Sequence, residues 1–389
     1  MSKRKKIIIA SKYFLFSQDN EIRKSTIDML DQLKASDISL RIIAQKVRHR
    51  ELNNLMRCKL PSQYYSMIQC IERGKEGIYS ISVERLENSI SMIAVVDEDA
   101  VFAFHAKIPI INPIHFLKDV PVGDKVKKYG IDFTGIEDVI RAVNLLDVHY
   151  NNFFEYKESE QFEIVSVLDG NTNRKRDALR DLFQVNIKDR YGKSQRILNL
   201  IFYYILSETT HNPIFKEVNY WGNFPSSSGV PNQSMVFLKE MLRLTHGGSK
   251  GDHQILIRKK PTTKKHGTER DVRLMNKCAK DFDTIIINPN FQSRLKNKVV
   301  CIVDDYTTNG YSSEAAKHLL LKAGVKKVIF LAVGKYGYVY QSTQYNLEGN
   351  VFEENGVVSN FISEKRIYNC TKPMALELSK LEELFEVKK

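Results

Sequence analysis

Five consecutive apolar residues, 299–303, constrain the fold more than any other feature of this chain. A continuous apolar run of this length is typical of a strand that is buried on both faces, as in a parallel sheet. Residues 312–323 have the composition of a helix, and Gly324 is suited to end it because glycine adopts the left-handed conformation of a helix C-terminus without strain. The sequence therefore predicts a strand, a short loop and a helix, which is the building unit of an α/β fold.

The loop between this strand and helix is rich in polar groups. Asp304 and Asp305 end the strand, and Thr308, Asn309 and Gly310 precede the helix. A helix N-terminus offers unpaired N–H groups and a positive dipole end, which favour phosphate. Carboxylates accept hydrogen bonds from the hydroxyl groups of a sugar. These residue types favour a sugar-phosphate site, and an ordinary acidic turn between a strand and a helix is the alternative.

This run resembles the ribose 5-phosphate-binding motif of type I phosphoribosyltransferases, in which an apolar strand and an acidic pair precede a Thr-x-Gly-x-Thr/Ser loop. The resemblance implies that Asp304 and Asp305 bind the ribose 2′ and 3′ hydroxyls. It also implies that the 5-phosphate is cradled by Thr308, Asn309, Gly310, Tyr311 and Ser312. The loop departs from the family at Asn309, where Thr is common, and at the bulky Tyr311, although neither residue lacks a backbone N–H group.

The preceding segment resembles the ComF-like branch of the same family. The similarity covers about residues 219–334 and rests on a basic strand end with a Thr at 258–263, an Arg-x-x-Asn helix at 273–276, and Phe282. In the family, a mobile cationic segment covers the active site during reaction. The residues predicted to contact pyrophosphate or to belong to the closing loop are Arg258, Lys259 and Lys264. A solvated run of charges is the alternative.

A second loop, residues 221–229, follows a strand predicted at residues 217–220. The family places its pyrophosphate-binding loop here, but this loop contains no Lys or Arg. Without neutralisation of its charge, pyrophosphate is a poor leaving group. Three interpretations stay open: backbone amides and serines suffice with help from Arg258 or Lys259, pyrophosphate handling is lost, or the stretch is a plain linker.

The amino-terminal half alternates between strand and helix patterns, which predicts a parallel sheet with helices on both faces. Strands are predicted at residues 6–10, 40–44, 93–96 and 108–111, and helices at 22–35, 51–70 and 100–106. The predicted fold class is thus α/β with two parallel-sheet, Rossmann-like domains. The predicted boundaries are residues 1–145 for the first domain, 146–345 for the second with a hood extension, and 346–389 for a tail with a docking helix.

The first domain resembles, more weakly, the haloacid-dehalogenase-like family. Residues 95–99 and the small residues that follow them are similar to the family's fourth, acidic motif. The family expects an Asp-x-Asp nucleophile after the first strand, but this chain has Ser11, Lys12 and Tyr13 there, and Gln45 replaces the expected Ser or Thr of the second motif. Because a phosphoaspartyl intermediate requires a carboxylate nucleophile, the domain is predicted to be inactive as a phosphatase and to bind or assemble instead.

Mg²⁺ is the cofactor that the phosphoribosyltransferase resemblance implies. In that family it is held by the substrate, and here Asp304 and Asp305 are the side chains expected to assist. Asp97 and Asp99 are a second candidate pair, for which a solvated acidic turn is the alternative.

The region between the two predicted domains has three further patterns. Residues 138–152 and 174–183 are predicted to be helical, and the strongly apolar run 197–208 is predicted to be a helix or strand of the hood. In the tail, leucines at 376, 378, 381 and 384 have roughly helical spacing, which favours a docking helix.

Composition limits the setting and the partners. Five cysteines without metal-ligand spacing favour a reducing compartment, and no run approaches the length of a membrane helix or of a signal peptide's apolar region, so a cytoplasmic protein without membrane contact is expected. The net charge of +13 suits phosphate-rich ligands, a nucleic acid or a protein complex, and a role in solubility alone is equally compatible. A homo-oligomer is left open.

The sequence therefore predicts a phosphoribosyltransferase-type enzyme that binds phosphoribosyl pyrophosphate or a nucleotide and makes or breaks a bond at ribose C1′. One alternative is a non-catalytic sensor of the same ligands. Another is a nucleic-acid-associated effector of a bacterial stress or antiviral defence system, which rests on an analogy of domain arrangement. The acceptor group and the direction of reaction stay open.

Overall fold

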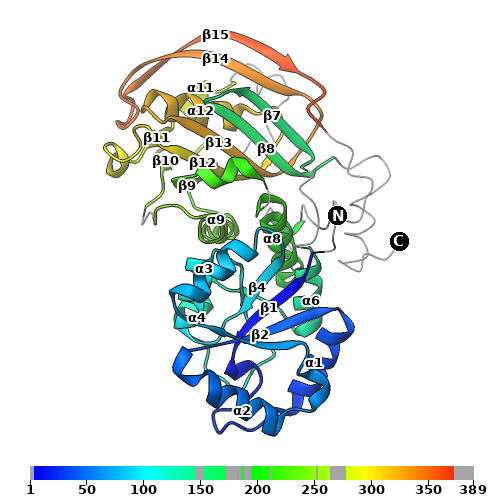
Figure 1. Cartoon of the computed structure of the whole chain (residues 1–389). Coiled ribbons are helices and arrows are strands. Elements are labelled where there is room, and N and C mark those ends of the chain that lie inside the picture. The colour runs from blue at the N-terminus through cyan, green and yellow to red at the C-terminus, as the bar shows by residue number, and fades with distance from the viewer. Residues whose placement is uncertain are drawn as a thin grey trace. The chain divides into compact units, whose positions relative to one another are not determined.

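A computed structural model of the chain describes residues 4–145, 152–171, 182, 185–187, 194–210, 212–250, 253–262 and 277–371. The chain divides into two compact units (Figure 1). Unit 1 comprises Met1–Tyr150 and Ser194–His211, and unit 2 comprises Asn151–Lys193 and Asn212–Lys389. No helix of the described ranges is both long enough and apolar enough to cross a membrane.

Unit 1 is built on a six-stranded parallel sheet with the order β3-β2-β1-β4-β5-β6, which is the Rossmann-like order. Its strands are β1 Lys6–Ser11, β2 Ile38–Ala44, β3 Ile68–Glu72, β4 Ser89–Ile93, β5 Ile110–Asn112 and β6 Ile131–Asp132. Its helices are α1 Lys24–Ala35, α2 His49–Lys59, α3 Lys75–Glu84, α4 Asp97–Ala106, α5 Asp124–Tyr129, α6 Ile136–Leu145 and α8 Gln195–Thr210, with 3-10 turns η1 Lys12–Phe14, η2 Lys46–Arg48 and η3 Ser62–Tyr64. The predicted α/β class with a parallel sheet is confirmed for this unit.

Two sequence predictions within unit 1 are corrected, and one element was missed. The helix predicted to reach residue 70 ends at Lys59, because Pro61 has no N–H group to continue it, and β3 follows. The strand predicted at residues 93–96 is instead β4, which ends at Ile93. Helix α3 was not predicted at all.

The position of helix α8 contradicts the prediction that residues 197–208 belong to a hood extension of the second domain. The helix packs against α6 and β6 within unit 1. Its first turn is held by Arg196, whose Nε donates to both oxygens of Asp138 at 2.9 Å, and its last turns by Ser207, whose Oγ donates to the Leu145 carbonyl at 2.5 Å. The apolar run at 197–208 therefore completes the first core, because almost every side chain of this helix is buried there.

Unit 2 contains a five-stranded sheet with the order β7-β8-β13-β12-β9, in which only β7 runs antiparallel to its neighbour. The strands of unit 2 are β7 Phe154–Ser159, β8 Phe162–Asp169, β9 Tyr220–Asn223, β10 Leu256–Arg258, β11 Ile285–Ile287, β12 Val299–Thr307, β13 Lys327–Lys335, β14 Tyr340–Gly349 and β15 Val357–Ile367. Its helices are α9 Gln233–His246, α11 Ala279–Phe282 and α12 Tyr311–Lys322, with 3-10 turns η4 Pro213–Glu217 and η5 Pro289–Phe291. The strand β12 lies between β13 and the edge strand β9, so it has a parallel neighbour on each side.

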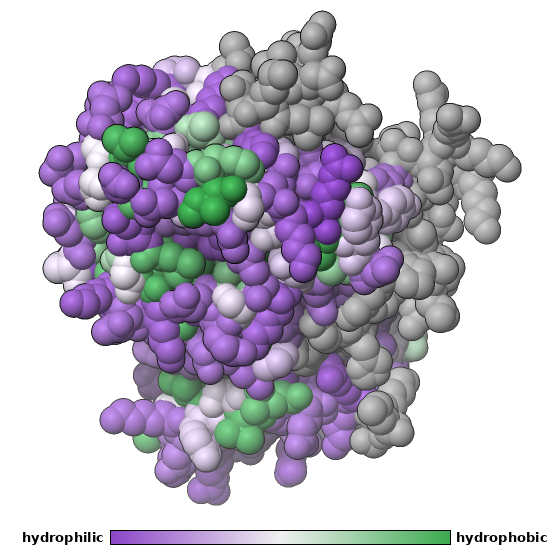
Figure 2. All heavy atoms as spheres, turned by 90° about the horizontal axis from the view of Figure 1, so that it is seen from above, coloured by the Kyte–Doolittle hydropathy of each residue, from purple (hydrophilic) through white to green (hydrophobic). Residues whose placement is uncertain are grey.

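The antiparallel hairpin of β14 and β15 replaces the polar tail that was predicted after residue 345. The predicted boundary falls inside β14. Strand β15 is largely exposed, and Val358 and Ile362 are each 62% exposed. Seen from above, small groups of hydrophobic side chains interrupt a mostly hydrophilic face (Figure 2). The predicted helix at 376–384 and, apart from Leu182, the predicted helix at 174–183 lie outside the described residues.

Candidate functional site

The strand, loop and helix predicted around residues 299–323 are present in unit 2 as β12 and α12. Strand β12 pairs in parallel with β13 on one side and β9 on the other, and its five apolar residues are fully or almost fully buried. The strand continues to Thr307, so the loop is only three residues long, from Thr308 to Gly310. The prediction of a strand, a loop and a helix is therefore confirmed, except that the strand continues two residues beyond Asp305, which was predicted to end it.

Asp304 and Asp305 lie near the carboxyl end of β12, and both are half-buried. Because successive side chains of a strand point to opposite faces, Asp304 shares a face with Tyr306, and Asp305 with Thr307. Asp304 Oδ1 accepts a hydrogen bond from the N–H of Asp305 at 2.9 Å, and Asp305 Oδ1 accepts one from the N–H of Tyr306 at 2.5 Å. The two carboxylates therefore lie on opposite faces of the sheet, next to the loop that follows β12.

The loop forms a turn that leads directly into α12. Gly310 has a φ of 92°, in the region that favours glycine, and a Cβ atom there would lie 2.2 Å from the ring of Tyr340. Thr308 is exposed, and Asn309 and Ser312 are half-buried. The first N–H groups of α12 have no acceptor within the helix. The loop thus presents backbone donors at a helix N-terminus, which is the arrangement that a phosphate cradle requires.

The side chain of Tyr311 points away from that cradle. It is buried, and its hydroxyl donates to Glu364 Oε1 of β15 at 2.8 Å. Burial, with this carboxylate beside it, raises the pKa of Tyr311. Of the five predicted phosphate-binding residues, Tyr311 can therefore contribute only its backbone N–H.

Lys335, the last residue of β13, is hydrogen-bonded to the backbone of this loop. Its side chain is completely buried, and Nζ donates to the carbonyl oxygens of Thr308 at 2.6 Å, Val339 at 2.9 Å and Tyr336 at 3.3 Å. Burial lowers the pKa of Lys335 to about 8. Sequence reasoning missed this residue, because nothing in the local pattern distinguishes it from an exposed lysine at a strand end.

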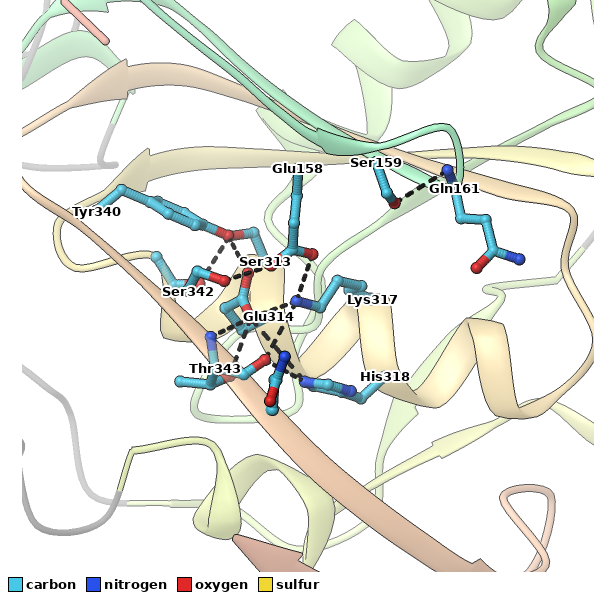
Figure 3. A network of polar contacts seen from close by, with 12 residues as sticks. Glu158, Ser159, Gln161, Ser313, Glu314, Lys317, His318, Tyr340, Ser342 and Thr343 are labelled. Carbon is cyan, nitrogen blue, oxygen red and sulfur yellow. Dashed lines mark hydrogen bonds and ion pairs between the residues drawn. The ribbon is translucent and has the colours of Figure 1, made fainter. Parts of the chain in front are cut away.

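A buried polar network fastens α12 to β14 (Figure 3). Glu314 lies at its centre and accepts from Lys317 Nζ at 2.6 Å, from the Thr343 N–H at 2.7 Å and from the Tyr340 hydroxyl. Lys317 also donates to Glu158 of β7 at 2.8 Å. Burial raises the pKa of Glu314, whereas burial and the neighbouring Lys317 lower the pKa of His318 to about 4. The network therefore fixes the position of α12, the helix that follows the loop.

Two stacked aromatic rings occupy the neighbouring part of this sheet edge. Tyr306 and Tyr336 lie with ring centroids 4.9 Å apart and nearly parallel planes. A Cβ atom at Gly334 would lie 2.2 Å from the Tyr306 ring, so only glycine allows the ring to cross β13 there. The pKa of Tyr306 is raised by burial. This face of the edge is therefore filled with protein side chains.

Arg258 does not act as the predicted pyrophosphate ligand. Its side chain is buried and paired with Asp281, with Nη2 and Oδ1 2.9 Å apart. Its Nε donates to the Ser226 carbonyl at 2.8 Å and its Nη1 to Thr284 Oγ1 at 2.6 Å. The guanidinium group is thus committed to the fold, where it braces the loop after β9. Lys259 is exposed, and Lys264 lies outside the described residues.

The loop after β9 begins three residues later than predicted, because Glu217 belongs to η4 and the strand is Tyr220–Asn223. The loop is closed on itself: Ser226 Oγ donates to the Val230 carbonyl at 2.6 Å, and the Gly229 N–H donates to the Ser226 carbonyl at 3.1 Å. Residues 224–230, all of which the structure describes, include no Lys or Arg. The loop therefore supplies no side-chain charge to a pyrophosphate.

In unit 1, the second candidate metal pair is used by the fold. Asp99 is completely buried, and its Oδ2 accepts from the N–H groups of Val95 at 2.9 Å and Val96 at 3.1 Å. Its Oδ1 pairs with Arg73. Asp97 Oδ1 accepts from the Lys125 N–H at 2.8 Å. Asp99 is thus a helix cap with a cationic partner, which contradicts its assignment as a metal ligand.

Within the described ranges, no three His, Cys, Asp or Glu side chains come together as a metal-binding group. Asp304 and Asp305 nevertheless fit a supporting role toward Mg²⁺, which prefers oxygen ligands and often keeps most of its shell from substrate phosphates and water. Among the described residues, no Lys or Arg pairs with Asp305, so none of these cations neutralises its negative charge. Two carboxylates suit an ion that arrives with its substrate better than a resident one.

No protein-family model, curated protein or solved structure matches the chain.

Proposed function

We propose that the loop from Thr308 to Gly310, together with the first two residues of α12, binds the 5-phosphate of a phosphorylated ribose. We further propose that unit 2 makes or breaks a bond at C1′ of phosphoribosyl pyrophosphate or a nucleotide. The observation that supports this most directly is the position of the loop. It joins the carboxyl end of β12, an inner strand with parallel neighbours on both sides, to a helix N-terminus, and open α/β sheets bind ligands at such positions.

The residues available at this edge suit that chemistry. Thr308 and the first N–H groups of α12 are donors for a phosphate, and the carboxylates of Asp304 and Asp305 accept from ribose hydroxyls. Mg²⁺, bound with the substrate, would neutralise charge on pyrophosphate. In the reaction, the bond from C1′ to the leaving oxygen breaks with its electron pair, and the lone pair of a nucleophile forms the new bond at C1′. The protein's own task is to position and desolvate the sugar.

Calorimetric titration with ribose 5-phosphate, and with phosphoribosyl pyrophosphate plus MgCl₂, tests the site. Wild-type protein is expected to bind both ligands, and Asp305→Ala to bind them at least about tenfold more weakly, because a hydrogen bond to a charged group contributes about 1.5 kcal/mol or more. Asp124→Ala is the control, since that carboxylate is 96% exposed and lies in unit 1. Equal affinities of wild type and the Asp305 variant would remove the assignment of Asp305.

A non-catalytic sensor of the same ligands is the second candidate. It is favoured by Arg258, which is buried with Asp281, and by the uncharged loop after β9. An assay of pyrophosphate release with phosphoribosyl pyrophosphate and a panel of nucleobases separates the two. Release above the rate of spontaneous hydrolysis supports the enzyme, and tight binding without release supports the sensor.

A further inference from the structure

Lys335 is an unusual lysine, because its ammonium group is buried and has no acidic partner in the part of the chain that the structure describes. No carboxylate of the described residues lies within ion-pair distance of Nζ. The group is surrounded by three carbonyl oxygens and by the ring of Phe154, whose centroid lies 5.0 Å away. Burying a charge without neutralising it is costly, so such a group usually has a role beyond packing.

The position of this charge connects it with the loop. The shortest of its hydrogen bonds is to the carbonyl of Thr308, the first residue of the loop, and the N–H of Gln341 donates to the carbonyl of Asn309 at 2.8 Å. Two successive loop carbonyls are therefore turned toward the protein. A peptide unit whose carbonyl points inward directs the following N–H outward, which is the orientation that an anion requires.

We propose that the ammonium group of Lys335 is the fixed positive charge of the phosphate site, and that it couples ligand binding to the uptake of a proton. This inference rests on the proposed function and adds a positioning residue to it. A dianionic phosphate above the loop favours the charged form of Lys335, and the charged form in turn favours the phosphate. The loop after β9 also has a buried cation behind its backbone, Arg258, but Asp281 neutralises that charge. The ammonium group behind the loop after β12 has no carboxylate partner among the described residues.

Several other titratable side chains lie near Lys335 in the sheet or along the chain. They are its in-register neighbour Asp169 on β8, Asp305 and Tyr306 on β12, Tyr336 beyond β13, and Cys370. Burial raises the pKa of both Tyr306 and Cys370, so these two groups stay neutral to higher pH than usual. Burial lowers the pKa of Lys335 to about 8, so Lys335 changes charge at lower pH than either Cys370 or Tyr306.

The affinity for ribose 5-phosphate as a function of pH tests the proposal. The phosphate is already a dianion for most of the range from pH 7 to pH 9, since its second ionisation is near pH 6. Wild-type affinity is expected to fall about tenfold between pH 7 and pH 9, in proportion to the protonated fraction of a group with a pKa of about 8. Lys335→Met is expected to bind weakly with a flat profile. Lys326→Met, which removes an exposed lysine just before β13, is the control and is expected to keep the wild-type profile.

Proton uptake gives an independent readout. Titrations at pH 8 in buffers of different ionisation enthalpy are expected to show that wild-type protein binds roughly half a proton with the ligand. A lysine that only braces the loop would show no uptake, and a flat wild-type profile with no uptake would overturn this inference while leaving the phosphate site in place. Absence of ribose 5-phosphate binding at every pH would instead overturn the proposed function. Because both wild-type measurements stand without a variant, misfolding of Lys335→Met does not affect the test.

Discussion

The two parallel sheets both carry acidic residues at their carboxyl ends, but the two units use them differently. In unit 1, Asp99 is completely buried, and Arg73 and two backbone N–H groups occupy its two oxygens. In unit 2, Asp305 is half-buried and has no cationic partner among the described residues. Location at the ligand-binding edge of a sheet is therefore not sufficient for a site. The polar groups there must also be uncommitted within the fold.

Asp99→Ala is expected to give the largest effect, a loss of about 3–5 kcal/mol from the stability of unit 1. The substitution leaves Arg73 without its carboxylate and removes the acceptor for two N–H groups of the α4 cap. Urea unfolding measures this loss of stability. The single tryptophan, Trp221, lies in unit 2, so its fluorescence reports on the unfolding of that unit. The far-UV circular dichroism midpoint should fall more than the tryptophan fluorescence midpoint.

The control for that substitution is Glu98→Ala, which changes an exposed neighbour on the same helix. Its stability is expected to stay within about 0.5 kcal/mol of wild type. If Asp99→Ala is equally mild, the carboxylate is not committed to the fold, and the contrast between the two sheets is lost.

Gly310→Ala is expected to destabilise unit 2 by about 3 kcal/mol and to abolish ribose 5-phosphate binding. The new methyl group combines an unfavourable left-handed backbone with overpacking against Tyr340. Gly337→Ala is the matched control, because Gly337 also has a positive φ but has open space where a Cβ would be. It should cost about 1 kcal/mol, from backbone strain alone. Equal losses in Trp221-detected unfolding would show that contact with Tyr340 is unimportant.

Acidification is expected to weaken unit 2 through His318 by about 2 kcal/mol between pH 7 and pH 4.5. The pKa of His318 is lowered from its ordinary value of 6.5 to about 4 by burial. Between these two values the unfolded chain binds a proton that the folded histidine does not. The contribution is therefore complete above pH 6.5 and is lost as the pH falls toward 4.

Comparison with His318→Gln isolates this contribution, since glutamine can donate to the Thr343 carbonyl that His318 Nε2 contacts at 2.9 Å, yet it does not titrate in this range. The difference between wild type and the variant should shrink as the pH is lowered. A constant difference from pH 7 to pH 4.5 would mean that folding does not lower the pKa of His318.

Thr308→Val is expected to give the smallest effect. The side chain is exposed, so stability should change by less than about 0.5 kcal/mol. Loss of one hydroxyl donor should weaken ribose 5-phosphate binding about fivefold, which corresponds to about 1 kcal/mol. Thr308→Ser keeps the hydroxyl and should keep most of the affinity. If both variants bind like wild type in calorimetry, only backbone groups contact the phosphate.

The parts of the fold that were predicted correctly have local signals. Five apolar residues in succession and a glycine after the helix sufficed to place β12 and α12. Strand β3 was missed because it follows Pro61 closely and only three of its five residues are apolar. The hairpin of β14 and β15 was missed because most of its side chains are polar and exposed. Its sequence therefore lacks the alternation of apolar and polar residues by which a half-buried strand is predicted.

The candidate site, like the fold, could be predicted only where its signal is local in the sequence. The positions from Asp304 to Ser312 fall within one short window, which a single sequence is able to show. Arg258 is buried and Lys259 is exposed, and the ion-pair partner of the buried Arg258 is Asp281, which lies 23 residues further along the chain. The role of Lys335 depends on a carbonyl 27 residues before it. Composition identifies a cation at each of these positions, but only the tertiary contacts decide whether it faces solvent or supports a loop.

The ring of Tyr340 gives the site a practical boundary. Tyr340 packs against Gly310 and begins β14, and β14 is held in place by its pairing with β15 as far as Ile367. A shortened protein that stops at residue 345 would keep every residue of the loop but cut β14 in two and lack its only paired strand in the described region. The loop is consequently not a portable module, and any transplant into another scaffold must carry the chain through Ile367.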